Sequence, residues 1–323
     1  MSKAIRIHAH GGPEVLKWEQ VPTPQPGPAE ALIRHEAVGL NFIDVYFRTG
    51  LYKAALPATL GIEGAGVVLA VGEKVTNIVP GDRVAYAGGP LGAYATERVI
   101  NAEKLVKLPE GIDFKTAGAM MLQGLTAYFL LHRTCKVQPG QTILVHAAAG
   151  GVGLILCQWA RHLGAEVIGV VSSEAKAEIA RANGAAHAIV GHANLAAEVK
   201  QITGGAMVPV VYDSVGKDTF GPSLDCLAPL GLMVSFGNAS GPVPPVDIAT
   251  LATKGSLFLT RPSFASYMSA PQDIATGAAA LFEVVGSGAV KISVNQSFPL
   301  EQAAAAHAAL EARQTTGSTV LIP

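Results

Sequence analysis

A run of small residues between an apolar strand and an apolar helix constrains this chain most. The strand pattern covers Thr142–His146, the small residues are Ala147–Gly153, and the helical pattern begins near Gly151. Small side chains at a strand-to-helix turn let a phosphate approach the backbone, and the helix N-terminus offers N–H donors and a positive dipole end. The segment therefore predicts the phosphate-binding turn of a βαβ unit, where a dinucleotide would bind.

Length and composition favour two globular domains. The chain has 323 residues, half of them hydrophobic and 15% charged, which supports a large buried core and argues against disorder. Its net charge of −1 gives no electrostatic attraction for nucleic acid or for an anionic membrane. We expect neither partner.

Several features favour a cytoplasmic location. The three cysteines are scattered and suit a reducing compartment, and residues 1–6 lack the apolar core of a signal peptide. Residues 142–160 contain no formally charged residue and approach membrane-spanning length. The glycine cluster inside that stretch instead predicts a buried strand, a loop and a helix.

The pattern along the chain changes after Phe114. Before it, short apolar runs separated by Gly/Pro turns predict a β-rich domain, at 4–10, 31–40, 64–72, 83–87 and 93–100. A long helix is predicted over 117–131. Strands then alternate with helices, at 142–146, 166–171, 187–190, 209–213, 232–237 and 256–260, which predicts an α/β fold with a doubly wound parallel sheet. Helices at 273–285 and 300–313 and strands at 290–298 and 318–322 are predicted to return to the first domain. We expect a first domain over 1–124 and 265–323 and a second domain over 125–264.

The second strand of the βαβ unit bears on cofactor choice. NAD-selective sites usually carry an acidic residue at this strand's end. Here the strand ends in Ser172 and Ser173, and Lys176 follows one helical turn later. Hydroxyls and an ammonium group would attract a 2′-phosphate, so NADPH is favoured over NADH. Glu174 could act either way, and a plain helix N-cap at the serines is compatible with both cofactors.

Several segments together resemble a known family. They are residues 39–46 (GLNFIDVY), 61–66 (GIEGAG), 80–84 (PGDRV), 124–128 (GLTAY), 146–153, 211–216 (VYDSVG), 236–238 (FGN) and 260–262 (TRP). The chain resembles the NADPH:quinone oxidoreductases, the zeta-crystallin-like, zinc-free branch of the medium-chain dehydrogenase/reductases. The resemblance implies a GroES-like β-rich catalytic domain, a Rossmann domain and a cofactor cleft between them.

The zinc enzymes of this superfamily place a cysteine and two histidines where this chain has Asn41, Tyr46 and Ile62. Their lobe of four close cysteines has no counterpart here, so we expect no metal. Without zinc, a quinone or an activated alkene is a better hydride acceptor than a simple alcohol. Side chains that stabilise developing charge on oxygen then become important. Asn41, Tyr46 and Tyr52 are the candidate catalytic donors. The sequence is equally compatible with Tyr46 as a packing aromatic, and Tyr52 is also compatible with a place at the cleft rim.

The resemblance also implies a set of cofactor-binding residues. Relatives often carry a tyrosine near the position of Gly191 and a lysine at that of Ser318, so the adenosine side departs from the family pattern, and His192 would substitute only in part. Arg261 could instead be a surface ion-pair partner. The expected cofactor-binding residues are Asn41, Thr126, Ala149, Gly150, Gly151, Val152, Ser172, Lys176, His192, Val215, Phe236, Asn238, Arg261 and Gly317.

The leading hypothesis is an NADPH-dependent quinone reductase, with zinc-independent hydride transfer to a quinone in the interdomain cleft. Reduction of α,β-unsaturated carbonyls is the alternative within enzymes. A crystallin-like or RNA-binding protein is the alternative outside them, although no aromatic–basic stripe is present. An apolar edge strand at 256–260 suggests a homodimer.

Overall fold

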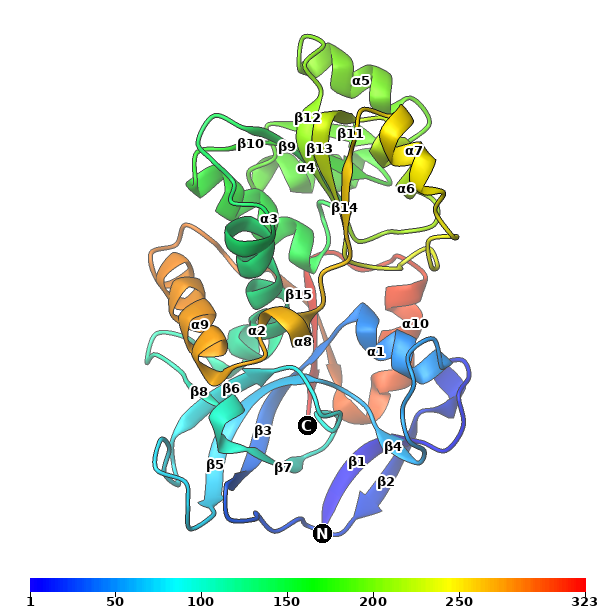
Figure 1. Cartoon of the computed structure of the whole chain (residues 1–323). Coiled ribbons are helices and arrows are strands. Elements are labelled where there is room, and N and C mark those ends of the chain that lie inside the picture. The colour runs from blue at the N-terminus through cyan, green and yellow to red at the C-terminus, as the bar shows by residue number, and fades with distance from the viewer. The chain divides into compact units, whose positions relative to one another are not determined.

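The computed structural model describes residues 1–323, and the chain divides into two compact units (Figure 1). Unit 1 contains Met1–Leu125, Met268–Gly286 and Ile292–Pro323. Unit 2 contains Thr126–Tyr267 and Ser287–Lys291. Unit 1 is therefore assembled from segments that lie on both sides of unit 2 in the sequence.

Unit 2 is built on a six-stranded sheet in which every pair of neighbours is parallel. The strand order is β11-β10-β9-β12-β13-β14, the order of a doubly wound dinucleotide-binding sheet. This confirms the predicted α/β class. The strands are β9 (Thr142–His146), β10 (Glu166–Val171), β11 (His187–Val190), β12 (Val208–Asp213), β13 (Leu227–Ser235) and β14 (Phe258–Thr260). The helices are α3 (Gly151–His162), α4 (Glu174–Ala182), α5 (Leu195–Ile202), α6 (Phe220–Leu224), α7 (Ile248–Thr253) and α8 (Phe264–Tyr267).

The sheet of unit 2 forms because its central strands are apolar on both faces. Leu144, Ile168, Val211 and Met233 are all fully buried, as expected when helices cover both sides. Pro209 lies in the central strand β12, and its missing N–H coincides with an irregularity in the register between β12 and β13.

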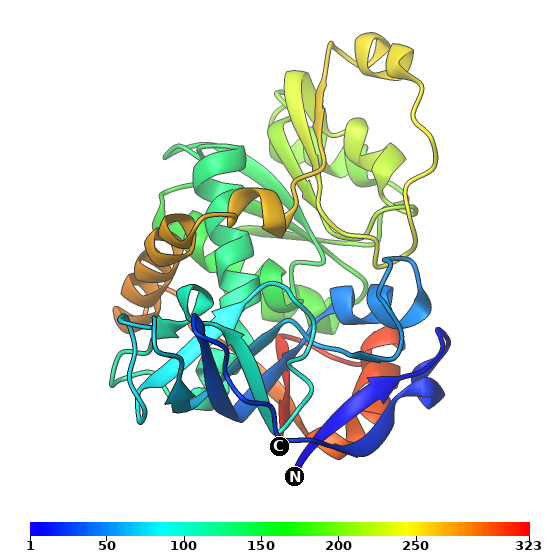
Figure 2. The same ribbon diagram turned by 60° about the horizontal axis from the view of Figure 1, so that its bottom comes forward.

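Unit 1 contains a seven-stranded and a three-stranded sheet. The larger has the order β15-β16-β3-β5-β6-β8, with β7 also paired to β3, and the smaller has the order β2-β1-β4. The C-terminal strand β16, red in Figures 1 and 2, pairs antiparallel with β3. The strands are β1 (Ser2–Ile7), β2 (Lys17–Val21), β3 (Glu30–Leu40), β4 (Ala58–Thr59), β5 (Glu63–Val71), β6 (Arg83–Ala87), β7 (Glu97–Asn101), β8 (Val106–Lys107), β15 (Val294–Pro299) and β16 (Ser318–Ile322). The helices are α1 (Phe42–Thr49), α2 (Phe114–Phe129, which continues into unit 2), α9 (Pro271–Gly286) and α10 (Ala303–Glu311).

Some predicted element limits were wrong. The strand expected over 93–100 begins only at Glu97, because residues 93–96 form a bend with a single bridge between Ala4 and Ala95. The long helix starts at Phe114 and ends in a π-helical turn over Leu130–Thr134. The last helix is preceded by a 3₁₀ turn at Leu300–Gln302. The stretch 142–160 forms a strand, a turn and a helix as expected, and none of the helices is both long and apolar enough to span a bilayer.

Candidate active site

Asn41 lies where β3 ends and α1 begins, as the N-cap residue of that helix. Its backbone N–H donates to Asp44 Oδ2 at 2.9 Å. Its side chain is engaged at both ends by other elements: Nδ2 donates to Glu63 Oε2 at 2.7 Å, and Oδ1 accepts from Gln123 Nε2 at 3.1 Å. An amide nitrogen carries two hydrogens, so one N–H of Asn41 is left to donate to a ligand.

The partners of Asn41 are themselves buried and hydrogen-bonded. Glu63 Oε1 accepts from the backbone N–H of Leu122 at 2.8 Å, and Gln123 Oε1 accepts from Ser318 Oγ at 2.7 Å. Burial raises the pKa of Glu63 to about 8, against the donors Asn41 and Leu122, which lower it. We call Asn41, Glu63, Gln123 and Ser318 the amide network. It draws on β5, α2 and β16 as well as on the start of α1.

Tyr46 and Tyr52 lie on α1 and on the turn after it. Their ring centroids are 5.2 Å apart in an edge-to-face arrangement, and Tyr52 N donates to Tyr46 O at 3.0 Å. Tyr46 is buried and also lies near Phe42, with 6.4 Å between the ring centroids. Asn41 and the two tyrosines therefore lie on one short segment of unit 1, and each tyrosine also packs against aromatic neighbours.

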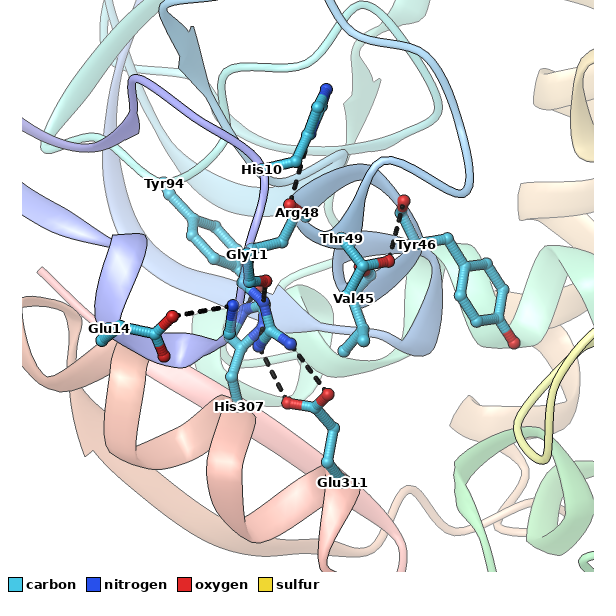
Figure 3. Close-up of polar contacts among 11 residues, drawn as sticks. His10, Gly11, Glu14, Val45, Tyr46, Arg48, Thr49, Tyr94, His307 and Glu311 are labelled. Carbon is cyan, nitrogen blue, oxygen red and sulfur yellow. Dashed lines mark hydrogen bonds and ion pairs between the residues drawn. The ribbon is translucent and has the colours of Figure 1, made fainter.

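A buried charged cluster supports α1 from its other side (Figure 3). The Arg48 guanidinium forms two hydrogen bonds with Glu311, each 2.8 Å long, and also donates to His307 Nδ1 at 3.1 Å. Because a guanidinium can only donate, His307 carries its proton on Nε2 and donates to Tyr94 Oη at 3.0 Å. The Tyr94 hydroxyl then donates to Asp44 Oδ2 at 3.1 Å. This chain of bonds fixes α1 against α10, and Figure 3 shows the Tyr46 ring turned away from it.

In unit 2 the loop after β9 has the geometry of an anion cradle. Gly150 caps α3 without any side-chain hydrogen bond, so the N–H groups of the first helical turn have no side-chain cap. A Cβ on Gly153 would lie 2.2 Å from Ala147 O, so only glycine fits there. Ala147 itself has a positive φ of 50°. Helix α3, glycine-lined and uncapped at this end, fits a dinucleotide pyrophosphate.

Asp213 organises the turn after β12. Its Oδ1 accepts from the backbone N–H groups of Val215 at 2.7 Å and Gly216 at 3.1 Å. Its Oδ2 accepts from Thr219 Oγ1 at 2.7 Å and from Ser223 Oγ at 3.2 Å. Ser223 Oγ also lies 2.8 Å from His146 Nε2, at the end of β9. Asp213 thereby joins the turn that carries Val215 to the strand that leads into the glycine loop.

Three further predicted residues gather at the ends of β13 and β14. The backbone N–H of Phe236 donates to Asp213 O at 2.8 Å. Arg261 Nη1 donates to the carbonyls of Ser235 at 2.9 Å and of Gly237 at 3.0 Å. The amide of Asn238 is satisfied when its oxygen accepts from Arg261 Nη2 at 3.0 Å. Arg261 therefore ties backbone carbonyls together at the carboxyl end of the sheet.

The remaining predicted residues divide between the two units. Ser173 caps α4 by accepting from the Lys176 backbone N–H at 3.4 Å. The neighbouring Ser172 is exposed. His192 is exposed just after β11, and Thr126 is half-buried in α2. Gly317 precedes β16 with a φ of 59°, and a Cβ there would lie 2.4 Å from Ser293 O.

Comparisons with known proteins agree with this arrangement. Residues 27–110 match the family described as "Alcohol dehydrogenase GroES-like domain", and residues 151–283 match "Zinc-binding dehydrogenase". The chain is 55% identical to a quinone oxidoreductase of Pseudomonas aeruginosa over the full length of both proteins. The chain belongs to the quinone oxidoreductase family.

Two further relatives add detail. This chain superposes on the crystal structure of Escherichia coli quinone oxidoreductase complexed with NADPH with a TM-score of 0.97, at 47% sequence identity. The superposition covers 99% of this chain and 100% of the E. coli chain. A 2-haloacrylate reductase of Burkholderia is 47% identical over 100% of this chain and 99% of its own length. The quinone oxidoreductase family therefore has a close relative that is named for a different acceptor.

Zinc does not fit this quinone oxidoreductase homologue, although one matching family is named for it. The side chain of Ile62 is apolar and buried, and the Asn41 amide is held by Glu63 and Gln123. No group of three or more histidine, cysteine or acidic side chains is placed to hold a metal.

Sequence reasoning missed several residues of the site. Glu63 and Asp213 lie inside the motifs that carry the family resemblance, and an acidic residue in an apolar strand could have drawn attention to each. Gln123 gave no such signal, and Ser318 was noted only as a departure from the family's lysine, because each is a common polar residue whose partner lies far away in the sequence.

Proposed function

We propose that this chain is an NADPH-dependent quinone reductase that works without zinc. The observation that carries the proposal is the Asn41 amide, oriented by Glu63 and Gln123 in a chain that belongs to the quinone oxidoreductase family. The E. coli relative, 47% identical, was solved with NADPH, which supports the choice of cofactor.

When bound, NADPH supplies the hydride. The chain's own residues have to hold the acceptor and stabilise negative charge as it develops on the acceptor oxygen. Asn41 offers an amide N–H for this, and the hydroxyls of Tyr46 and Tyr52 are further donors on the same segment. Because a quinone is conjugated, hydrogen-bond donors can suffice where an alcohol would need a Lewis acid.

We assign the cofactor to the residues predicted from the sequence. The loop at 147–153 and the N-terminus of α3 would receive the pyrophosphate. Ser172 and Lys176 would receive the 2′-phosphate, because no carboxylate occupies the tip of β10. Val215, Phe236, Asn238 and Arg261 stand at the carboxyl ends of β12 to β14, the edge where ligands of such sheets bind. Asn41, Thr126, His192 and Gly317 complete the proposed contacts.

We also propose a cytoplasmic homodimer. The edge strand β14 exposes Phe258 and Leu259, with 60% and 38% of their surface accessible. An unpaired apolar edge can add a second copy of itself across a two-fold axis.

The deciding experiment is oxidation of NADPH and NADH by the purified protein, followed by absorbance, against quinones, enones, 2-haloacrylates and aldehydes. We expect the highest kcat/KM with NADPH and a quinone. Turnover of enones or haloacrylates with no turnover of any quinone would favour the second candidate, reduction of activated alkenes, which the Burkholderia relative supports. Absence of turnover with every acceptor would overturn both.

A further inference from the structure

We propose that Gln123 is a positioning residue, which together with Glu63 holds the direction in which the Asn41 amide faces and so keeps Asn41 a hydrogen-bond donor toward the acceptor. This inference rests on the proposed function and assigns a role to a residue that the family motifs do not include.

The two ends of a carboxamide are nearly equal in size, so only its neighbours decide which way it points. On one side, Glu63 Oε1 is engaged by the backbone N–H of Leu122, which can only donate. This holds the Glu63 carboxyl group in place, with Oε2 presented to Asn41 Nδ2. Glu63 therefore engages one end of the Asn41 amide.

On the other side, Gln123 links Asn41 to Ser318. Gln123 Nε2 donates to Asn41 Oδ1 at 3.1 Å, and Gln123 Oε1 accepts from the Ser318 hydroxyl at 2.7 Å. With 7% of its surface accessible, Gln123 has little water to replace these partners. Glu63 therefore engages the nitrogen end of the Asn41 amide, and Gln123 engages the oxygen end.

Without Gln123, the buried Oδ1 of Asn41 loses its donor. A buried acceptor that loses a donor carries the cost of its lost hydration, so the amide is held less firmly. The Asn41 N–H then points less often toward the oxygen on which negative charge develops. The effect reaches the reaction only through Asn41.

The test is a double-mutant cycle between Gln123→Met and Asn41→Ala, because methionine keeps the length and removes the polar atoms. We expect Gln123→Met alone to lower kcat with a quinone by about 10-fold to 100-fold, somewhat less than loss of a transition-state donor itself. The KM for NADPH should change less than about 2-fold. In the Asn41→Ala background the same substitution should change kcat by less than about 2-fold, since its target is gone.

Gln158→Met is the matched control. Gln158 is 4% accessible and donates to the carbonyls of Leu154 and Lys291, both at 3.1 Å, within unit 2. It should lower the thermal midpoint as Gln123→Met does and leave kcat unchanged. If Gln123→Met does not fold, Ser318→Ala replaces it, with an expected loss of about 3-fold to 10-fold that also vanishes without Asn41.

Losses that multiply in the double variant would overturn the inference, as would an equal loss of kcat in Gln158→Met. A wild-type protein without turnover would instead overturn the proposed function. In that case NMR exchange of the Asn41 side-chain amide protons gives the answer without turnover. The exchange should be at least about 10-fold faster in Gln123→Met than in the wild type or in Gln158→Met, because the broken network opens more often. Equal exchange in all three would count against the positioning role.

Discussion

Asn41 occupies the N-cap of α1, where asparagine normally bonds the first turn of its own helix. Asp44 and Asn41 form a capping box here, and the Asn41 amide is also engaged by residues from β5 and α2. An N-cap side chain that is held by two further elements is positioned more firmly than helix capping requires, as expected at a functional site. Lys176 lies in the first turn of α4, just after the end of β10. Its backbone N–H donates to the capping residue Ser173, so its backbone and its side chain have separate roles.

At this residue scale we predict that Lys176→Ala raises the KM for NADPH by about 10-fold or more, the loss expected for one charge-assisted hydrogen bond to a phosphate. The KM for NADH should stay within about 2-fold, because NADH has no 2′-phosphate. Alanine preserves the helix and its cap. Lys200→Ala, on the exposed face of α5, is the control and should change neither KM. Equal increases for both cofactors would remove Lys176 from the 2′-phosphate site.

Among the elements, β14 stands out because it is an edge strand with apolar side chains exposed to solvent. We predict that Phe258→Glu converts a dimer into a monomer, because facing carboxylates would repel each other across the two-fold axis. Sedimentation velocity measures the change. Val190→Glu is the matched control, since Val190 is 45% accessible on β11 at the opposite edge of the same sheet. A wild-type protein that sediments as a monomer, or a dimer that survives Phe258→Glu, would contradict the assignment of this edge.

Elements were far more predictable from the sequence than the amide network. Three strands of unit 2 have the predicted limits, at 142–146, 166–171 and 187–190, because continuous apolar runs bounded by glycine specify them locally. Asn41 was identified as a candidate donor in a segment that carries the family resemblance. The roles of Gln123, Ser318 and His307 were not predicted, because their partners lie 82, 195 and 259 residues away and periodicity carries no information about such pairs.

Unit 1 contains four buried titratable groups whose effects on the pH dependence of its stability have opposite signs. Burial raises the pKa of Asp44 to about 7 and of Glu63 to about 8, and lowers the pKa of His35 and of His307 to about 3. Below the ordinary histidine value of 6.5 the unfolded chain binds more protons at the histidines, so stability falls as the pH drops. Above the ordinary acidic values of 3.8 and 4.5 the folded chain holds more protons at the acids, so stability falls as the pH rises.

We therefore predict a plateau in the free energy of unfolding of unit 1 between about pH 4.5 and 6.5, where the two effects oppose each other. Above the plateau, the free energy of unfolding should fall up to pH 8, by at most about 1.4 kcal/mol per pH unit for each acid. It should also fall as the pH drops below the plateau. Urea titration followed by Trp18 fluorescence in a Trp159→Phe variant isolates unit 1. Glu63→Gln should make the alkaline fall shallower. A free energy that rises from pH 6.5 to 8 would contradict the prediction.

The pairing of β16 with β3 has a consequence for how the chain is made. Unit 2 is translated complete before residues 292–323 leave the ribosome, so it can fold while unit 1 still lacks a strand. Ser318, whose hydroxyl donates to Gln123, is synthesised after the whole of unit 2. A nascent chain can thus acquire its dinucleotide-binding sheet early, whereas the amide network around Asn41 is complete only after β16 has been made.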